Sequence, residues 1–570
     1  MDPRPLQLLR GLPGAPTRRP LVLEIDFTGG VLRQAPVDPL SALRQRNTPT
    51  LPDIVTALRH AVGDDRVAAV VVLGGVTIGS AQADEIGSGL DAVRASGIAT
   101  YAFTESFGEM GAGTIPYGLA ARCEHVWLQP SGQVGLTGIA SAVTLLRGVL
   151  DRLGVEPQFG QRYEFKTAAD QFVATEVSDA NRAMTTRLTA SVMEQISAVI
   201  ADRRGIAAHV LAEIVDRAPL SAAEARAAGL VDRVGYRDEF YAAVRAAHGE
   251  DVELVFAHRY AKRRTKRSPV EQVRRRRAPQ VAVIAVHGAI VVGRSRQGRP
   301  GAIWDRAGSD TVVAALRTAQ ESDRVRAVVL HVDSPGGSYV ASDAIRCAVL
   351  GLRASGRPVV ASMGGVAASG GYFAAMGADR VFALPTTITG SIGVLAGKFV
   401  VAGLAQRLGV VRELVGAGAN ATMFTADAGF TDEQRARLDG WLDEVYDDFT
   451  RKAAEDRGIP WEDLEPLARG RVWTGADALS HRLVDELGGR DAAVGHACRL
   501  ARLNRDAADL VDWPSLGLVD RIKAAESTHA PAAALAHPAL GGLEAWLAAL
   551  GDAAGAPTGV LSLPWPIELR

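Results

Sequence analysis

The chain has 570 residues, more than one hydrophobic core usually organises, so two or more domains are expected. Hydrophobic residues make up 47% of the sequence and charged residues 22%, a balance that excludes an intrinsically disordered chain. The formal net charge of -1 gives no reason to expect a nucleic-acid ligand, and three scattered cysteines exclude a disulfide framework and fit a reducing compartment.

The N-terminal segment is interrupted by Pro3, Pro5, Pro13 and Pro16 and contains no long apolar run. We therefore expect neither a signal peptide nor a membrane anchor there. No uncharged apolar run in the sequence reaches the ~18 residues that span a bilayer, so the expected location is the cytoplasm or the periphery of a membrane. Because no zinc-ligand spacing such as His-Glu-x-x-His occurs, the sequence predicts no metal site and no cofactor.

The two halves of the sequence resemble each other, which predicts a tandem duplication. Residues 65–75, DRVAAVVVLGG, resemble residues 323–333, DRVRAVVLHVD, and each reads as a charged start followed by a buried parallel strand. Further along, Tyr117 in GTIPYGLAARCEHVW stands opposite Tyr372 in ASGGYFAAMGADRVF. Strands that alternate with helices in this way are typical of an α/β fold with a parallel sheet.

A basic segment, 258–279, separates the halves and carries ten Lys or Arg residues. Its first interpretation is a solvated linker or surface arm. The second is peripheral contact with an anionic membrane, worth ~1 kcal/mol per basic residue near the surface. Nucleic-acid binding is not expected, because Tyr260 is the only aromatic residue interleaved with the basic ones. The predicted segments are an N-terminal repeat domain (1–257), a basic linker (258–280), a C-terminal repeat domain (281–500) and an Ala/Pro/Gly-rich C-terminal extension (501–570).

The second half contains a serine in a run of small residues, MGGVAASGGYFAAMGADR (363–380). Ser369 ends a predicted strand and begins a predicted helix, a position suited to a nucleophile and equally to a helix cap. The Gly-x-Ser-x-Gly elbow of the α/β-hydrolases is excluded, because Ala367 stands where its first glycine would be. Upstream, the two glycines after Pro335 end another strand, and their backbone N–H groups can hold an oxyanion. The residues alone leave the nucleophile and the helix cap open.

Four motifs resemble those of the signal peptide peptidase A family, also called protease IV: VDSPGGS, MGGVAASGGYFAAMGADR, TTITGSIGV and GRVWTGADA with LVDELGG. The resemblance covers residues 50 to 500, as in the long, duplicated form of that family, although members of this form often carry an N-terminal membrane anchor. It implies a tandem duplication of a ClpP/crotonase-like spiral ββα domain and a serine endopeptidase with a Ser-Lys dyad. It also implies cleaved signal peptides and other short hydrophobic peptides as substrates, and a homo-oligomer, expected to be a homotetramer.

The resemblance implies Ser369 as the nucleophile and requires a lysine as its partner. The second half has no lysine at the expected place, but the first half has Lys166, which stands opposite Ala421 in the register of the repeat. Conversely, Thr114 of the first half occupies the position of Ser369. Lys166 is therefore implied as the general base, a role that needs a neutral amine and hence burial. An ordinary surface lysine is the alternative.

Two further roles follow from the resemblance. Ser391 in TGSIGV corresponds to the hydroxyl that orients the lysine amine, against the alternative of an ordinary turn serine. Gly336, Gly337 and Gly370 are the candidates for the oxyanion hole through their backbone N–H groups. Which of the two glycines after Pro335 donates stays open.

Two other functions stay open as well. The same fold hosts crotonase-like acyl-CoA enzymes, in which His331, beside Asp333, would serve as an acid–base residue. A catalytically inactive, peptide-binding member of the fold is the other alternative. The peptidase is preferred, because a histidine at a strand end is more often structural and a crotonase does not need a duplicated chain with a matched serine and lysine.

Overall fold

A computed structural model describes residues 19–33, 48–75, 78–265, 278–295, 306–505, 507–513 and 561–562. The chain divides into two compact units, and unit 1 comprises residues 1–78, 86–138 and 196–267. Unit 2 comprises residues 79–85, 139–195 and 268–570. Residues 139–195, which come from the first half of the sequence, therefore belong to the unit built mainly from the second half.

Unit 1 contains a six-stranded parallel sheet with the strand order β8-β4-β3-β2-β1-β9. Its strands are β1 (Leu21–Asp26), β2 (Val67–Leu73), β3 (Ala99–Thr104), β4 (His125–Leu128), β8 (Arg233–Val234) and β9 (Glu253–Phe256). Two short strands, β5 (Gln133–Val134) and β7 (Leu220–Ser221), pair antiparallel. The helices lying wholly in this unit are α2 (Leu51–Ala61), α4 (Thr114–Ala120), α8 (Ala208–Arg217), α9 (Ala222–Ala227), α10 (Arg237–His248) and α11 (Ala257–Thr265).

Unit 2 contains an eight-stranded sheet with the main order β19-β17-β15-β13-β10-β21, in which β16 pairs with β15 and β20. Its strands are β10 (Gln280–His287), β13 (Val325–Ser334), β15 (Val359–Ala368), β16 (Arg380–Ala383), β17 (Ile388–Gly390), β19 (Val472–Thr474), β20 (Glu486–Leu487) and β21 (Asp509–Trp513). All pairs are parallel except β17 with β19. Its main helices are α13 (Ser309–Glu321), α14 (Tyr339–Ala354), α15 (Gly370–Ala375), α17 (Asp432–Arg457), α19 (Gly475–Ser480) and α20 (Arg490–Leu500).

Two small sheets complete unit 2. One has the order β12-β11-β14-β22 and consists of β11 (Ala289–Val291), β12 (Arg306–Gly308), β14 (Gly336–Gly337) and β22 (Leu561–Ser562). The other is an antiparallel pair of β6 (Glu156–Gln161) and β18 (Leu395–Val400). Near β6 and β18 in sequence lie the short helices α5 (Arg147–Leu153), α6 (Asp170–Val173) and α16 (Ala402–Arg407). Two long helices, α3 (Ser80–Ala95) and α7 (Asp179–Arg204), begin in unit 2 and continue into unit 1.

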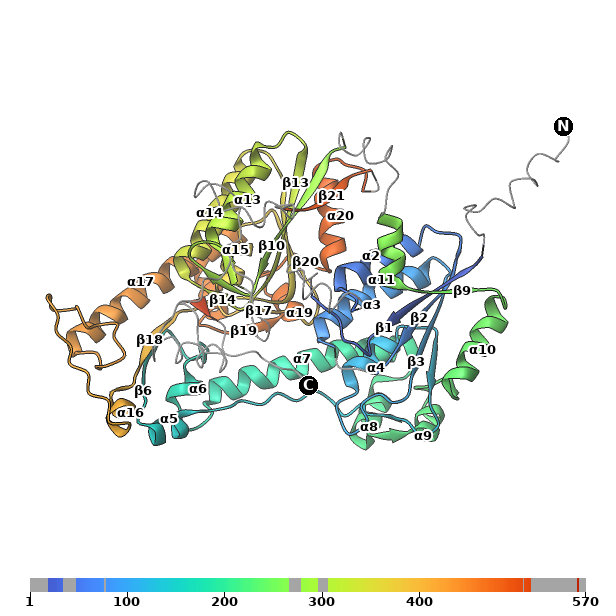
Figure 1. The fold of residues 1–570 in the computed structure, drawn as a ribbon, viewed down its shortest axis with the longest axis horizontal. Coiled ribbons are helices and arrows are strands. Elements are labelled where there is room, and N and C mark those ends of the chain that lie inside the picture. Colours follow the sequence, from blue (N-terminus) through green and yellow to red (C-terminus); the bar gives the residue numbers. More distant parts are fainter. Residues whose placement is uncertain are drawn as a thin grey trace. The chain divides into compact units, whose positions relative to one another are not determined.

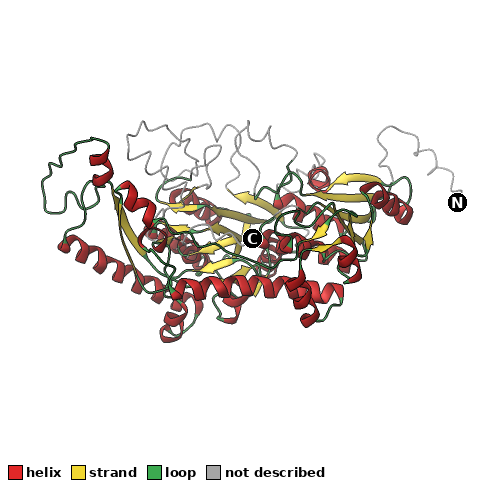
Figure 2. Ribbon diagram, turned by 90° about the horizontal axis from the view of Figure 1, so that it is seen from below, coloured by secondary structure: helices red, strands yellow, loops and turns green. Residues whose placement is uncertain are grey.

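The core of unit 2 lies on both faces of its sheet, because successive residues of a strand point to opposite sides. In β10, Ala282, Ile284 and Val286 face the cluster formed with α13, α14 and α15, whereas Val281 and Val283 face α20. Figure 1 shows these helices beside the sheet, and the view from below in Figure 2 shows helices packed against strands. Burial on both faces explains why these strands read as continuous apolar runs.

The predicted tandem duplication is confirmed by the sheets. The order β8-β4-β3-β2-β1-β9 of unit 1 repeats in unit 2 as β20-β16-β15-β13-β10-β21. The matched tyrosines make the same buried contact: the hydroxyl of Tyr117 donates to the carbonyl of Leu230 (2.8 Å), and that of Tyr372 donates to the carbonyl of Leu483 (2.9 Å). Each unit is thus a copy of the same α/β domain, as the sequence repeat predicts.

The segments at the ends of the repeats differ in part from the prediction. Residues 258–265 of the basic segment belong to α11, where the hydroxyl of Tyr260 donates to Asp64 (3.0 Å), while residues 266–277 lie outside the described residues. Within the C-terminal extension, β21 is an edge strand of the main sheet of unit 2, and most of the remainder also lies outside the described residues. In the part of the chain that the structure describes, every helix is too short or too polar to cross a bilayer.

Candidate active site

Ser369 lies at the turn between β15 and α15 and is fully buried. Its backbone has φ 54° and ψ −117°, and its N–H donates to the carbonyl of Gly390 (2.8 Å). Ser369 occupies the N-cap position of α15, but its side chain makes no capping hydrogen bond to the helix. A positive φ costs a non-glycine residue about 1–3 kcal/mol, and such residues cluster at functional sites.

The small residues around Ser369 allow two main chains to approach each other. A Cβ atom on Gly370 would lie 2.6 Å from Oγ of Ser342 and 3.1 Å from the backbone nitrogen of Gly337. A Cβ atom on Gly371 would lie 2.7 Å from the carbonyl oxygen of Ser334. The glycines after Ser369 therefore bring the start of α15 against the loop that follows β13.

Lys166 follows β6 in a turn and is fully buried. Its Nζ lies 2.8 Å from Oγ of Ser369, 3.0 Å from Oγ of Ser391 and 3.1 Å from the carbonyl oxygen of Ser391. A neutral amine has two N–H donors and one lone pair. Such an amine can direct both donors at the two oxygens of Ser391 and leave its lone pair for the hydroxyl of Ser369.

Burial lowers the pKa of Lys166 well below its ordinary value, because desolvation disfavours the charged form. Among the described residues no carboxylate forms an ion pair with this amine. The setting therefore favours a neutral amine, which can accept a proton. The sequence-based alternative of an exposed surface lysine is wrong.

Ser391 follows β17 and is also fully buried, with φ 50°. Its N–H donates to the carbonyl of Arg471 (2.7 Å), which fixes the turn, while its own hydroxyl and carbonyl both face Nζ of Lys166. A single residue thus offers two oxygen acceptors to the amine. This arrangement is more specific than that of an ordinary turn serine.

The oxyanion-hole candidates lie in the loop after β13 and at the start of α15. Gly336 and Gly337 have φ values of 103° and 149°, which are favourable only for glycine. The N–H of Gly336 donates to Oγ of Ser334 (3.1 Å), so that donor is engaged. The nitrogen of Gly337 lies close to Gly370, as noted above, so the loop after β13 and the start of α15 approach each other there.

The edge of β14 already carries an extended segment. Leu561 and Ser562 of β22 pair antiparallel with Gly337 and Gly336. The edge beside the oxyanion-hole candidates can therefore bind a peptide strand through its backbone.

His331 is not brought to Ser369. Its Nδ1 lies 3.3 Å from Oγ of Ser362, its neighbour in the register of β13 with β15. Ser369 follows Ser362 by seven positions along and just past β15, about 23 Å at the rise of a strand. Asp333 accepts a hydrogen bond from the N–H of Val366 (3.1 Å). Both side chains have structural contacts, so a Ser-His pair is not formed.

The first repeat lacks the corresponding chemistry. Thr114, which matches Ser369, lies at the start of α4 and donates through Oγ1 to the carbonyl of Gly138 (2.8 Å). The only lysine among the described residues of unit 1 is Lys262, whose side chain is 53% exposed. Ala421, which matches Lys166 in the second repeat, is an exposed loop residue.

Sequence reasoning missed the segment Arg469–Arg471, which contacts the turn of Lys166 and the turn of Ser391. The signal was present, because GRVWTGADA is one of the four motifs. No role was derived for it, since its contacts are with residues far away in the sequence.

Comparisons with known proteins show which families the chain resembles. Residues 103–252 and 351–504 match the family model described as Peptidase family S49, and residues 301–389 match that of Clp protease. The chain is 30% identical over 472 residues to Protease 4 of Salmonella typhi, which covers 80% of this chain and 72% of that protein. It is 29% identical over 394 residues to the chloroplastic serine protease SPPA of Arabidopsis thaliana, covering 69% of this chain.

The chain spans 57% of the length of that plant relative. Among solved structures, a mutant of ClpP1 from Listeria monocytogenes matches with 16% identity and a TM-score of 0.24. The match covers 37% of this chain and 94% of the ClpP1 chain.

Proposed function

Because the chain belongs to peptidase family S49 and is a serine peptidase, we propose that Ser369 is its nucleophile and Lys166 its general base. The observation that carries the proposal is the 2.8 Å separation of Nζ and Oγ between two fully buried residues. The acyl-CoA enzyme and the inactive peptide-binding protein gain no support from family membership or from the contacts of His331.

The reaction begins when Lys166 removes the proton from the hydroxyl of Ser369 as Oγ attacks the scissile carbonyl. The backbone N–H groups of Gly337 and Gly370 stabilise the tetrahedral oxyanion. Lys166 then gives its proton to the leaving amine, and an acyl-enzyme on Ser369 remains. A water molecule, deprotonated by Lys166, hydrolyses the ester and restores the hydroxyl. Ser391 holds the amine in the required orientation throughout.

The proposed substrates are cleaved signal peptides and other short hydrophobic peptides, bound in extended form along the edge of β14. The antiparallel pairing of residues 561–562 with this edge supports strand-like binding. Apolar side chains next to the site support a hydrophobic preference, since Ala368, Ile388 and Val472 cluster there with partly exposed Phe165 and Val366.

We also propose a homotetramer, and peripheral contact with anionic membranes through residues 258–279 from a location in the cytoplasm or at the membrane. Exposed apolar side chains of the segment 408–424, with Val411 94% and Phe424 75% exposed, support self-association. Exposed basic residues of α11 support lipid contact. Native mass spectrometry tests the tetramer, and co-sedimentation with phosphatidylserine vesicles, against neutral vesicles, tests the lipid contact.

Turnover of an internally quenched hydrophobic peptide tests the dyad. We expect Ser369→Ala and Lys166→Ala each to lower kcat by at least about 10²-fold, the lower bound for loss of a general base. The matched controls are Ser362→Ala, also a buried serine of β15, and Lys452→Ala, a lysine that pairs with Asp343 and Asp448. Full activity of both dyad variants would refute the proposal, as would labelling by a fluorophosphonate at a residue other than Ser369.

A further inference from the structure

Three consecutive residues, Arg469 to Arg471, connect the turn of Lys166 with the turn of Ser391. The carbonyl of Arg469 accepts from the N–H of Phe165 (3.2 Å). The N–H of Gly470 donates to the carbonyl of Ile392 (2.7 Å), and the carbonyl of Arg471 accepts from the N–H of Ser391 (2.7 Å). The main chain of this segment therefore touches the residue before the lysine and both residues of the Ser391 turn.

Gly470 lies directly against the main chain of Lys166. A Cβ atom on Gly470 would lie 2.5 Å from N, Cα and Cβ of Lys166, a distance that no real Cβ contact tolerates. These atoms belong to the main chain of Lys166 and the start of its side chain, so no side-chain rotation can move them away. Gly470 also has φ 82°, which favours glycine.

A second glycine, Gly393, packs against Gly470 and also lies beside the side chain of Lys166. A Cβ atom on Gly393 would lie 2.7 Å from Cα of Gly470 and 3.3 Å from Cδ of Lys166. Gly393 and Gly470 thus form a surface without side chains on which the stem of the lysine rests. The long lysine side chain has many rotamers, so a fitted surface restricts where its amine can lie.

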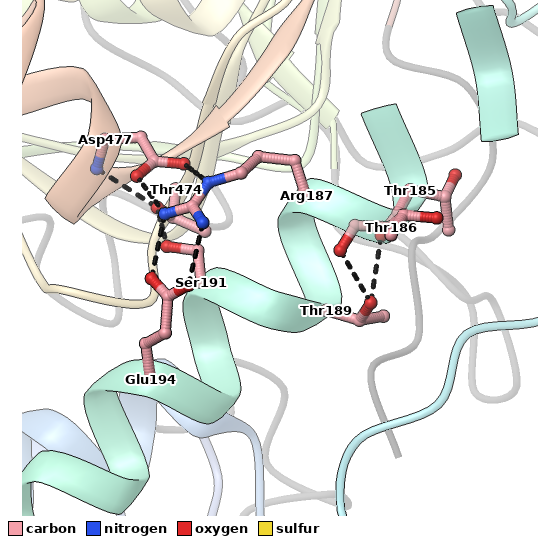
Figure 3. Close-up of polar contacts among 8 residues, drawn as sticks. All are labelled: Thr185, Thr186, Arg187, Thr189, Ser191, Glu194, Thr474 and Asp477. Atoms are coloured by element: carbon pink, nitrogen blue, oxygen red, sulfur yellow. Dashed lines mark hydrogen bonds and ion pairs between the residues drawn. The ribbon is translucent and has the colours of Figure 1, made fainter. Parts of the chain in front are cut away.

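The same segment is anchored at its far end by the helix that follows Lys166 in sequence. Figure 3 shows Arg187 of α7 between Asp477 and Glu194, with hydrogen bonds of 2.8–2.9 Å to both carboxylates. Beside them, the hydroxyls of Ser191 and Thr474 lie 2.7 Å apart and are fully buried. Residues 139–195 therefore hold the segment 469–477 at both ends, through Phe165 and through α7.

We propose that Gly470 is a positioning residue, which together with the Arg187–Asp477 anchor seats Lys166 so that its amine reaches Ser369. This proposal rests on the proposed dyad. It gives the GRVWTGADA motif a physical role. Gly470 packs against Lys166, and Thr474 and Asp477 attach the segment to α7. A displacement of about 1 Å between reacting groups costs about 10²-fold in rate, so a Cβ atom on residue 470 has a large expected effect.

The first test compares Gly470→Ala with Gly458→Ala. Gly458 also has a positive φ of 59°, but an added Cβ atom meets nothing within 4 Å, so this control carries the backbone strain without the clash. We expect Gly470→Ala to lower kcat about 10²-fold with KM within a factor of about two, and to move the acid limb of the pH–rate profile to higher pH as the amine leaves its buried position. Gly458→Ala is expected to keep the wild-type kcat and pH profile.

The second test uses Arg187→Ala, a substitution of a side chain that is 39% exposed and compatible with folding. Its control is Arg451→Ala, which removes a surface pair with Asp447 on α17. We expect Arg187→Ala to lower kcat about tenfold without a change in KM, as for the loss of charge-assisted hydrogen bonds worth about 1.5 kcal/mol. The control is expected to keep wild-type kinetics. Should Gly470→Ala fail to fold, this anchor variant decides the proposal.

The outcomes separate this inference from the dyad itself. The positioning role would be overturned if folded Gly470→Ala, or Arg187→Ala, kept the wild-type kcat and an unchanged acid limb of the pH–rate profile. The proposed dyad would still stand in that case, provided that Ser369→Ala and Lys166→Ala are inactive. Full activity of the two dyad variants would instead remove the proposed function.

Discussion

The amine of Lys166 lies 2.8 Å from the hydroxyl of Ser369, although 203 positions separate the two residues in the sequence. Both side chains come from unit 2, because residues 139–195 pack with the second repeat. The segment that carries Lys166 thus comes from the first half of the sequence but belongs to the unit of the second, while Thr114, the first-half equivalent of Ser369, makes a main-chain contact instead.

The rate of peptide hydrolysis should rise with pH through the pKa of Lys166. Burial lowers this pKa well below its ordinary value, so the amine becomes neutral and active at a pH well below the ~10.4 of a free lysine. The measurement is kcat/KM against pH with a fluorogenic peptide. A limb centred at the ordinary lysine pKa, or a profile without this limb, would contradict the assignment.

The stability of the wild type should depend on pH differently from that of Lys166→Met. The folded protein holds this amine neutral while the unfolded chain binds a proton, so the destabilisation is complete below the folded pKa and disappears as pH rises to ~10.4. Each unit of pKa lowering corresponds to about 1.4 kcal/mol. Denaturant unfolding at several pH values should therefore show wild-type stability rising relative to the Met variant across this window. Parallel pH dependences would show that the amine is not buried and neutral.

Loss of the Ser391 hydroxyl should lower kcat about tenfold with little change in KM, as for one lost buried hydrogen bond to the base. The informative pair is Ser391→Ala and Ser391→Gly. Glycine relieves the positive φ of 50° but still lacks the hydroxyl, so both variants should be impaired to the same degree. Wild-type activity in the glycine variant would reduce Ser391 to a backbone role.

Removal of residues 561–570 should lower the apparent KM for long peptide substrates several-fold and leave kcat unchanged. Residues 561–562 pair with the edge of β14 to which we assign the substrate strand, so the two strands compete. A synthetic peptide of residues 557–570 should inhibit the shortened enzyme competitively. The same peptide with Leu561→Pro and Ser562→Pro lacks two backbone donors and should inhibit less. Equal KM values for the two chain lengths would argue against this competition.

The sequence by itself determined the duplication and the α/β class, and it named the three side chains that we propose for the site. Apolar runs bounded by glycine turns are local properties, so strands such as β13 and β15 could be read from the chain. The motifs resembled those of the peptidase family closely enough to name Ser369, Lys166 and Ser391.

Only the tertiary structure decided that these side chains meet, that the amine is buried, and that the hydroxyl of Ser369 makes no capping hydrogen bond to α15. It also decided that residues 139–195 belong with the second repeat and that Gly470 lies so close to Lys166 that an added Cβ atom would be 2.5 Å from its main chain. The physical reason is that desolvation, close packing and a shared hydrogen bond depend on atoms brought together from distant parts of the chain. A local sequence pattern indicates which side chains are available, whereas the fold determines the environment of each one.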